Sequence, residues 1–120
     1  EGFLQSLKFE KIHIQEEICK LTGRYAKQRG KSRNKTWQRV QLLWWKGKPM
    51  RRDGEPYQKL LDRAYEEMFI QSESFRNALL ATGNAVITHS IGRNNEAETV
   101  LTEREFCSRL MKLREKYRVK

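Results

Sequence analysis

The chain has 120 residues, of which 38% are hydrophobic and 33% are charged, so we expect one domain over residues 1–120 with an ordinary core. Its formal net charge of +10 favours anionic partners such as nucleic acid, nucleotides and phosphorylated metabolites. No apolar run approaches the roughly 20 residues of a membrane span. Since no signal peptide is visible either, we expect a cytoplasmic protein without a membrane partner. Glu1 begins directly in helix-like sequence, so we expect N-terminal residues to be missing.

Apolar residues at helical spacing predict helices in most of the chain. The expected helices cover residues 3–9, 12–21, 34–44, 57–69 and 75–80, and Gly83 is well suited to end the last of these. A short basic segment lies between Gly23 and Gly30. Glycines and prolines break the pattern over residues 46–56.

The C-terminal third contains a predicted strand, a loop and a final helix. The stretch AVITH, residues 85–89, carries β-branched residues and predicts a short strand. The polar loop SIGRNNEAETVL follows over residues 90–101. Thr102 and Glu105 form a capping-box pattern that opens a helix reaching Tyr117. The fold class expected from these elements is mainly α, a compact single-domain helical fold with one or two short strands.

Positive charge is concentrated in residues 20–52, which hold twelve Lys or Arg and no acidic residue. Such a run can be a solvated basic face or an anion-binding surface. An imbalance of this size favours the second interpretation, with DNA as one such anion.

Several familiar chemistries leave no pattern in this sequence. No Cys and His cluster has zinc spacing, and neither a phosphate-binding glycine loop nor a GxSxG motif is present. With only two histidines, a histidine-based metal site is improbable. We therefore expect neither a metal nor a cofactor.

The loop that follows residue 89 is a candidate binding element. A loop of about a dozen residues in a small domain is more often functional than idle. Its glycine permits close backbone approach, and its other members offer donors and acceptors. The alternative is an exposed, mobile loop. The candidate ligand-binding residues here are His89, Ser90, Gly92, Asn94 and Thr99.

The first helix and the paired tryptophans supply further candidates. Glu1 and Lys8 are seven residues apart, so they share one helix face with Gln5 between them, although such a pair is usually a weak surface contact. Trp44 and Trp45 would point in different directions from a helix. Trp44 then fills the core and Trp45 stands at a pocket rim, where it stacks on a base, unless both are core residues.

Four stretches resemble, in order, motifs of the NADAR domain family (the YbiA-like superfamily). They are EGFLQSLKF, AKQRG, FRNALLATGNAVITHS and RLMKLRE, and they run from Glu1 to Arg114. Many members carry Asp-x-x-Trp-Gly after the last strand. This chain has a loop beginning His-Ser-x-Gly in its place, as in a divergent branch.

The resemblance implies a mainly α, metal-independent N-glycosidase that cleaves a ribose-to-base bond. It makes Glu1 the acidic helix residue and Lys8 the helix lysine, both catalytic, with Gln5, Lys27 and Trp45 at the ligand. The expected reaction removes ADP-ribose from guanine in a nucleotide or in DNA. Two alternatives stay open: action on phosphoribosylamino-pyrimidine intermediates of riboflavin synthesis, and a non-catalytic nucleotide or nucleic-acid binding module.

Overall fold

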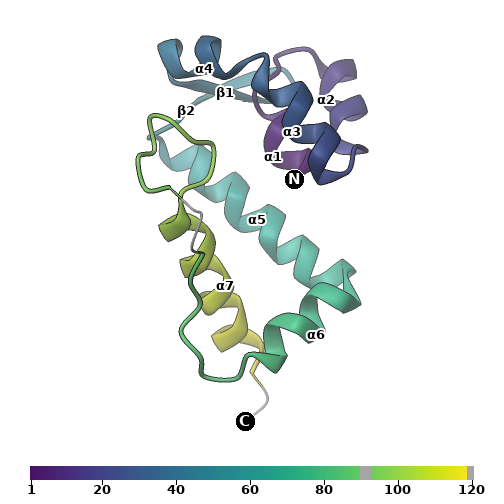
Figure 1. The fold of residues 1–120 in the computed structure, drawn as a ribbon, viewed down its shortest axis with the longest axis vertical. Coiled ribbons are helices and arrows are strands. Elements are labelled where there is room, and N and C mark those ends of the chain that lie inside the picture. The colour runs from purple at the N-terminus through teal and green to yellow at the C-terminus, as the bar shows by residue number, and fades with distance from the viewer. Residues whose placement is uncertain (90–92, 119–120) are drawn as a thin grey trace. The chain divides into compact units, whose positions relative to one another are not determined.

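The structure is a computed structural model that describes residues 1–89 and 93–118. Its described part is mainly α, as the sequence predicts, with a single pair of short strands (Figure 1). The elements in chain order are α1 Gly2–Ser6, α2 Ile12–Cys19, α3 Gly23–Lys31, α4 Asn34–Val40, β1 Leu42–Trp45, β2 Lys48–Arg51, α5 Glu55–Gln71, α6 Glu73–Ala81 and α7 Glu103–Tyr117.

Contacts divide the chain into two compact units. Unit 1 consists of Glu1–Tyr57 and Asn95–Val100, and unit 2 consists of Gln58–Asn94 and Leu101–Lys120. The helix α5 begins in unit 1 and contributes most of its length to unit 2. The single domain expected from chain length stays a prediction, because two contact units can belong to one domain.

Unit 1 is built around the short helix α1, which packs on α2 and α3. Leu7, Ile18 and Ala26 are fully buried among these elements. Small residues let the helices approach closely: a Cβ on Gly2 would lie 2.7 Å from the carbonyl oxygen of Cys19. No secondary structure was predicted for the segment from Gly23 to Gly30, which forms most of helix α3.

A β-hairpin corrects the prediction of one helix over residues 34–44. Helix α4 ends at Val40, where Gln41 adopts a left-handed φ of 54°. Strand β1 then pairs antiparallel with β2, and Trp45 lies opposite Lys48. The two turn residues, Lys46 and Gly47, both have positive φ, which suits the right-handed twist of a two-residue hairpin. Apolar spacing alone does not separate a short buried strand from the end of a helix.

Unit 2 packs α5, α6 and α7 around one apolar cluster. The buried members are Tyr65, Phe69, Leu79, Leu110 and Leu113. Thr102 and Glu105 form the predicted capping box at the start of α7. The predicted strand over residues 85–89 is wrong, because this stretch is irregular in the structure. Ile87 packs against the cluster without any strand partner.

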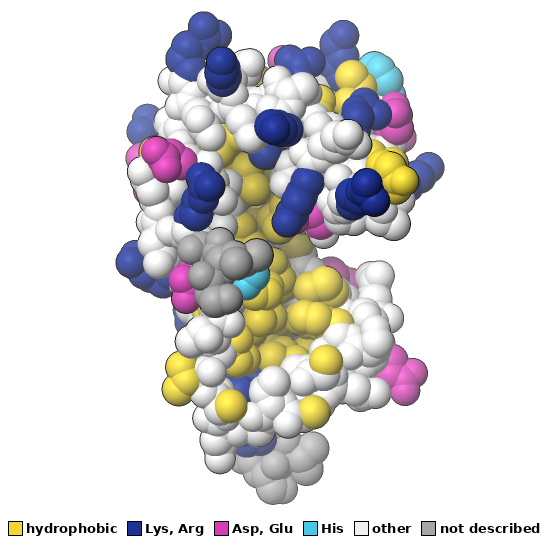
Figure 2. Space-filling view, viewed as in Figure 1, with side chains coloured by type: hydrophobic (Ala, Val, Ile, Leu, Met, Phe, Trp, Pro, Cys, Tyr) yellow, Lys and Arg dark blue, Asp and Glu magenta, His cyan; other side chains and the backbone are white. Residues whose placement is uncertain are grey.

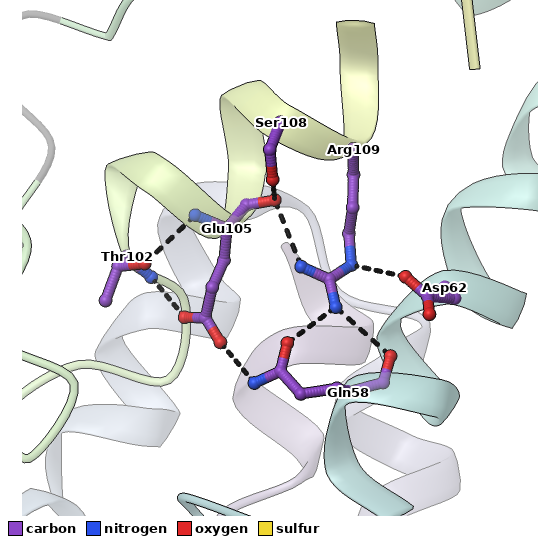
Figure 3. A network of polar contacts seen from close by, with 6 residues as sticks. All are labelled: Gln58, Asp62, Thr102, Glu105, Ser108 and Arg109. Carbon is purple, nitrogen blue, oxygen red and sulfur yellow. Dashed lines mark hydrogen bonds and ion pairs between the residues drawn. The ribbon is translucent and has the colours of Figure 1, made fainter. Parts of the chain in front are cut away.

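A polar network links α5 to α7 in unit 2 (Figure 3). The Arg109 guanidinium is ion-paired with Asp62 at 3.0 Å and donates from Nη2 to Gln58 Oε1 at 2.6 Å. Gln58 in turn donates to Glu105 Oε2 at 2.6 Å. Arg109 is buried, and these partners offset the cost of removing its charge from water. The network therefore has a structural role in joining the two helices.

Candidate functional site

A polar cluster lies where α1 meets α3 and α4 in unit 1. The Gln5 amide donates to Glu1 Oε2 at 3.2 Å, and Lys27 Nζ lies 3.4 Å from Glu1 Oε1. Lys8 Nζ donates to Asn34 Oδ1 at 2.6 Å. The structure thus gathers four of the predicted site residues, Glu1, Gln5, Lys8 and Lys27, and adds Asn34.

Gly30 allows helix α3 to lie close to the Gln5 side chain in this cluster. A Cβ on Gly30 would lie 1.8 Å from Gln5 Oε1, so only a residue without a side chain lets α3 approach α1 here. Gln5 is 8% exposed, and its Oε1 has no hydrogen-bond partner in the part of the chain that the structure describes. An unsatisfied buried acceptor is costly, and such atoms are rare in proteins. The cluster is therefore tightly packed but not fully satisfied.

The pKa of Lys8 is lower in the folded chain than that of an ordinary lysine. Burial lowers the pKa of its ammonium group from 10.5 to about 8, although the nearby Glu1 carboxylate favours the charged form. Near pH 8 the side chain therefore exists in both protonation states. Such a lysine can hold an anion as an ammonium or, when neutral, act as a nucleophile.

Lys8 also lines a pocket of about 310 Å³ in unit 1. Part of the pocket lining consists of charged side chains, and the rest is mostly aliphatic and aromatic. Its lining residues are Lys8, Phe9, Glu10, Lys11, Ile14, Arg33, Thr36, Trp37, Val40, Leu42 and Trp44. The Arg33 guanidinium lies 5.3 Å from the centroid of the Phe9 ring. Three cations and one carboxylate in the lining make the pocket net positive.

The two adjacent tryptophans line different pockets of unit 1. Successive side chains of a strand point to opposite faces, so Trp44 and Trp45 diverge. Trp44 lines the Lys8 pocket. Trp45 packs edge-on against Phe3, with ring centroids 5.1 Å apart, and lines a separate pocket of about 280 Å³ with Lys46 and Cys19. The divergence of the two rings agrees with the sequence-based expectation, and the ring that lines the Lys8 pocket is that of Trp44. The role of Trp45 at a ligand stays a prediction.

The remaining predicted residues belong to other surroundings. His89 is exposed in unit 2, with its ring 5.5 Å from the centroid of Phe106. Asn94, also in unit 2, accepts a hydrogen bond from the Arg104 amide at 3.1 Å. Thr99 lies in unit 1, where its carbonyl accepts from Arg52 Nε at 2.8 Å. Ser90 and Gly92 lie outside the described residues.

Sequence reasoning missed several residues of the Lys8 pocket. Asn34, Arg33 and Trp44 come from positions far from Lys8 in the chain, and no motif links them to it. The basic run over residues 20–52 was the one available signal for Arg33. Trp44 could have been found by reading LLWW as a strand.

Basic side chains cover much of the surface of unit 1 on the face drawn in Figure 2. Lys27 and Arg29 are ion-paired with Glu1 and Glu17. The other exposed cations of α3, α4 and the turn between them form no ion pair among the described residues; they are Arg24, Lys31, Arg33, Lys35 and Arg39. These five side chains remain available to an anionic partner.

Residues 1–89 and 93–118 contain neither a metal-binding cluster nor a membrane-spanning helix. No three His, Cys, Asp or Glu side chains lie together in a way that could hold a metal ion. None of the described helices is long and apolar enough to cross a membrane.

Comparison with known proteins overturns the resemblance to the NADAR family. The model of the bacteriophage protein GP30.3 family matches residues 1–115. A 17.1 kDa protein from the Gp30-rIII intergenic region of Enterobacteria phage T4 is 38% identical over 116 residues, which cover 96% of this chain and 76% of that protein. No solved structure matches the chain. The NADAR assignment is therefore wrong, since its short motifs are individually loose, and the chain belongs to the bacteriophage GP30.3 protein family.

Proposed function

We propose that unit 1 binds a nucleotide and that Lys8 holds its phosphate. The observation that carries this proposal is the setting of Lys8. Its ammonium group is partly buried beside aromatic side chains, and among the described residues it forms no ion pair with a carboxylate. A charge held in such surroundings is destabilised, which is why the pKa of Lys8 is lowered. A bound phosphate would offset that cost, and the net positive lining would attract it.

The proposal is tested by calorimetry with a nucleoside monophosphate and the matching nucleoside. Lys8→Met should weaken monophosphate binding by about 10-fold or more, the effect of a lost charge-assisted hydrogen bond, and should leave nucleoside binding unchanged. Lys35→Met is the matched control, because Lys35 is an exposed lysine of α4 outside the pocket. Equal losses in both variants, or no binding to the wild-type protein, would refute the proposal.

We propose as a second candidate function N-glycosidase activity on a ribose-to-base bond, which draws support from the electrostatic effect of Glu1 on Lys8. The Glu1 carboxylate is close enough to act on the Lys8 ammonium electrostatically. In such a reaction the bond from the anomeric carbon to nitrogen breaks, the base leaves with the electron pair, and water adds to the sugar. Glu1 would activate that water or stabilise the oxocarbenium-like transition state. Lys8 would hold phosphate or, when neutral, form a Schiff base with a ring-opened sugar.

This second candidate has a direct assay. The protein is incubated with ADP-ribosylated DNA and, separately, with a phosphoribosylamino-pyrimidine, and release of the sugar is measured. Glu1→Gln and Lys8→Ala should each lower turnover by at least about 100-fold. Glu16→Gln, which alters an exposed acidic residue of α2 outside the Lys8 pocket, is the control. Borohydride would trap a sugar on Lys8 only if that lysine is the nucleophile. Binding without sugar release from either substrate would leave a binding module.

We also propose that the exposed cations of α3 and α4 contact DNA in the cytoplasm of the cell that holds the protein. The support is their number and the finding that, among the described residues, those other than Lys27 and Arg29 form no ion pair. Because phosphate contacts give affinity without base specificity, this contact would raise the local concentration of nucleic acid around the pocket.

A further inference from the structure

We infer that the Lys8 pocket accepts a single nucleoside monophosphate unit, with the base against Trp44 and the phosphate between Lys8 and Arg33. The inference rests on the proposed nucleotide binding and adds the size of the ligand and its orientation. The orientation depends on Lys8 together with Trp44 and Arg33, and the sequence did not assign Trp44 or Arg33 to the site. The ligand so defined is smaller than the ADP-ribose expected from the sequence.

Pocket size sets the ligand class. Sites for small molecules usually measure about 300–1,000 Å³, and the Lys8 pocket, at about 310 Å³, lies at the lower end of that range. ADP-ribose contains two sugars, two phosphates and a base, whereas a nucleoside monophosphate contains one of each. The smaller ligand fills a pocket of this size, and the larger one would leave much of itself in solvent.

The apolar part of the pocket offers one accessible aromatic platform. Trp37 is 2% exposed and Phe9 is 6% exposed, and the Arg33 guanidinium lies over the Phe9 ring. Neither ring therefore offers a free face to a ligand. Trp44 is only partly buried and lines the pocket together with Val40 and Leu42. A base stacked on Trp44 would be flanked by these two aliphatic side chains.

The polar part of the pocket matches the charge of a phosphate monoester. Lys8, Lys11 and Arg33 contribute three positive charges, and Glu10 removes one, so the lining has a net charge of +2. A phosphate monoester carries about −1.5 to −2 near pH 7. Arg33 presents a planar fork that can bind two phosphate oxygens, and Lys8 adds a compact positive charge that also donates to Asn34. None of the three cations forms an ion pair among the described residues of unit 1.

The test compares guanosine 5′-monophosphate, guanosine and ADP-ribose by calorimetry, with variants of the two adjacent tryptophans. We expect the monophosphate to bind more tightly than ADP-ribose. Trp44→Ala should weaken its binding by about 5-fold to 100-fold, the loss of one base-stacking contact. Trp45→Ala, which changes the next residue of the same strand, should leave affinity within about twofold, since that ring belongs to another pocket.

A second variant keeps the test decisive if Trp44→Ala does not fold. Arg33 is exposed, so Arg33→Met should preserve the fold while weakening the monophosphate at least about 10-fold and sparing guanosine. Tighter binding of ADP-ribose, or a larger effect of Trp45→Ala than of Trp44→Ala, would overturn the inference and leave nucleotide binding intact. If none of the three ligands binds, the proposed function fails as well.

Discussion

At the scale of single residues, Lys8 has surroundings unlike those of an ordinary surface lysine. It belongs both to the polar cluster with Glu1 and to the aromatic pocket with Trp44. Burial stabilises its neutral form, and Glu1 and Asn34 stabilise its charged form. The balance lowers the pKa to about 8, within reach of physiological conditions. If the pocket binds a phosphate as proposed, the protonation state of this lysine should affect that binding.

The first prediction concerns the pH dependence of stability. The pKa of Lys8 is about 8 in the folded chain, against a usual value of 10.5. Between these values the unfolded chain binds the proton more, so stability relative to a Lys8→Met variant should rise with pH across that window and stay level below pH 8. Urea unfolding of both proteins at pH 7 to 10 measures this difference. A flat difference would show that Lys8 titrates normally.

Ligand binding should respond to pH with the opposite sign. The phosphate needs the charged lysine, so affinity for a nucleoside monophosphate should fall as pH rises through about 8. Lys8→Met should remove this fall, since no titrating group would remain at that position. Persistence of the same pH profile in the variant would assign the effect to another group.

At the scale of elements, the close approach of α1 and α3 decides the geometry of the polar cluster. Gly30 of α3 faces the Gln5 side chain of α1, and Gln5 in turn holds Glu1. Alanine is intrinsically the better helix former by about 1 kcal/mol. At this position, helix propensity favours alanine, whereas packing against Gln5 favours glycine. The steric overlap indicates that packing is the larger effect.

We predict that Gly30→Ala destabilises unit 1 despite its gain in helix propensity. The new Cβ would overlap Gln5 Oε1 and lie 3.1 Å from the Gln5 Cβ, so the helices must separate or Gln5 must move. Overpacking of this kind costs roughly 1–3 kcal/mol. Gly23→Ala is the matched control in the same helix, because its Cβ would meet only ordinary contacts at 3.6 Å. Denaturant unfolding would contradict the prediction if the two variants had equal stability.

At the scale of the whole molecule, charge is the dominant property. Twelve Lys or Arg lie between residues 20 and 52 with no acid among them, and the helices α3 and α4 place many of these side chains on the surface of unit 1. Two cations of α3, Lys27 and Arg29, form ion pairs with Glu1 and Glu17. The cations without ion pairs are therefore the better targets for a test of nucleic-acid binding.

We predict that DNA affinity falls steeply with salt and that the unpaired cations of unit 1 are responsible. Each phosphate contact on a duplex contributes about −0.9 to the slope of log affinity against log salt. Changing Arg24, Lys31 and Lys35 to Glu should weaken binding and make the slope shallower. Changing Arg63, Arg104 and Lys112 of unit 2 to Glu alters net charge equally and serves as the control. Equal effects of the two triple variants would indicate a response to net charge alone.

Local patterns explain which parts of this structure could be predicted. The long helix α5 and the capped helix α7 follow from sustained apolar spacing and from the Thr102 and Glu105 pair. The hairpin was not predicted because the stretch LLWW fits both a strand and the end of a helix. A strand was wrongly predicted over residues 85–89 because β-branched residues favour strands only when a partner strand is present. Glu1, Gln5, Lys8 and Lys27 were named, but on a family resemblance that has failed.

The sequence by itself determined the mainly α class and the basic character of the chain, because each of these depends on composition or on local periodicity. The expected helix over residues 3–9, with Glu1 and Lys8 on one face, was wrong, because α1 ends at Ser6 and Lys8 lies beyond it. Only the tertiary structure decided which distant residues complete the site. Asn34 and Arg33 reach Lys8 because α3 packs on α1 at a glycine, and Trp44 rather than Trp45 joins them because strand pleating alternates their directions. Contacts between residues far apart in the chain depend on packing, which no local pattern specifies.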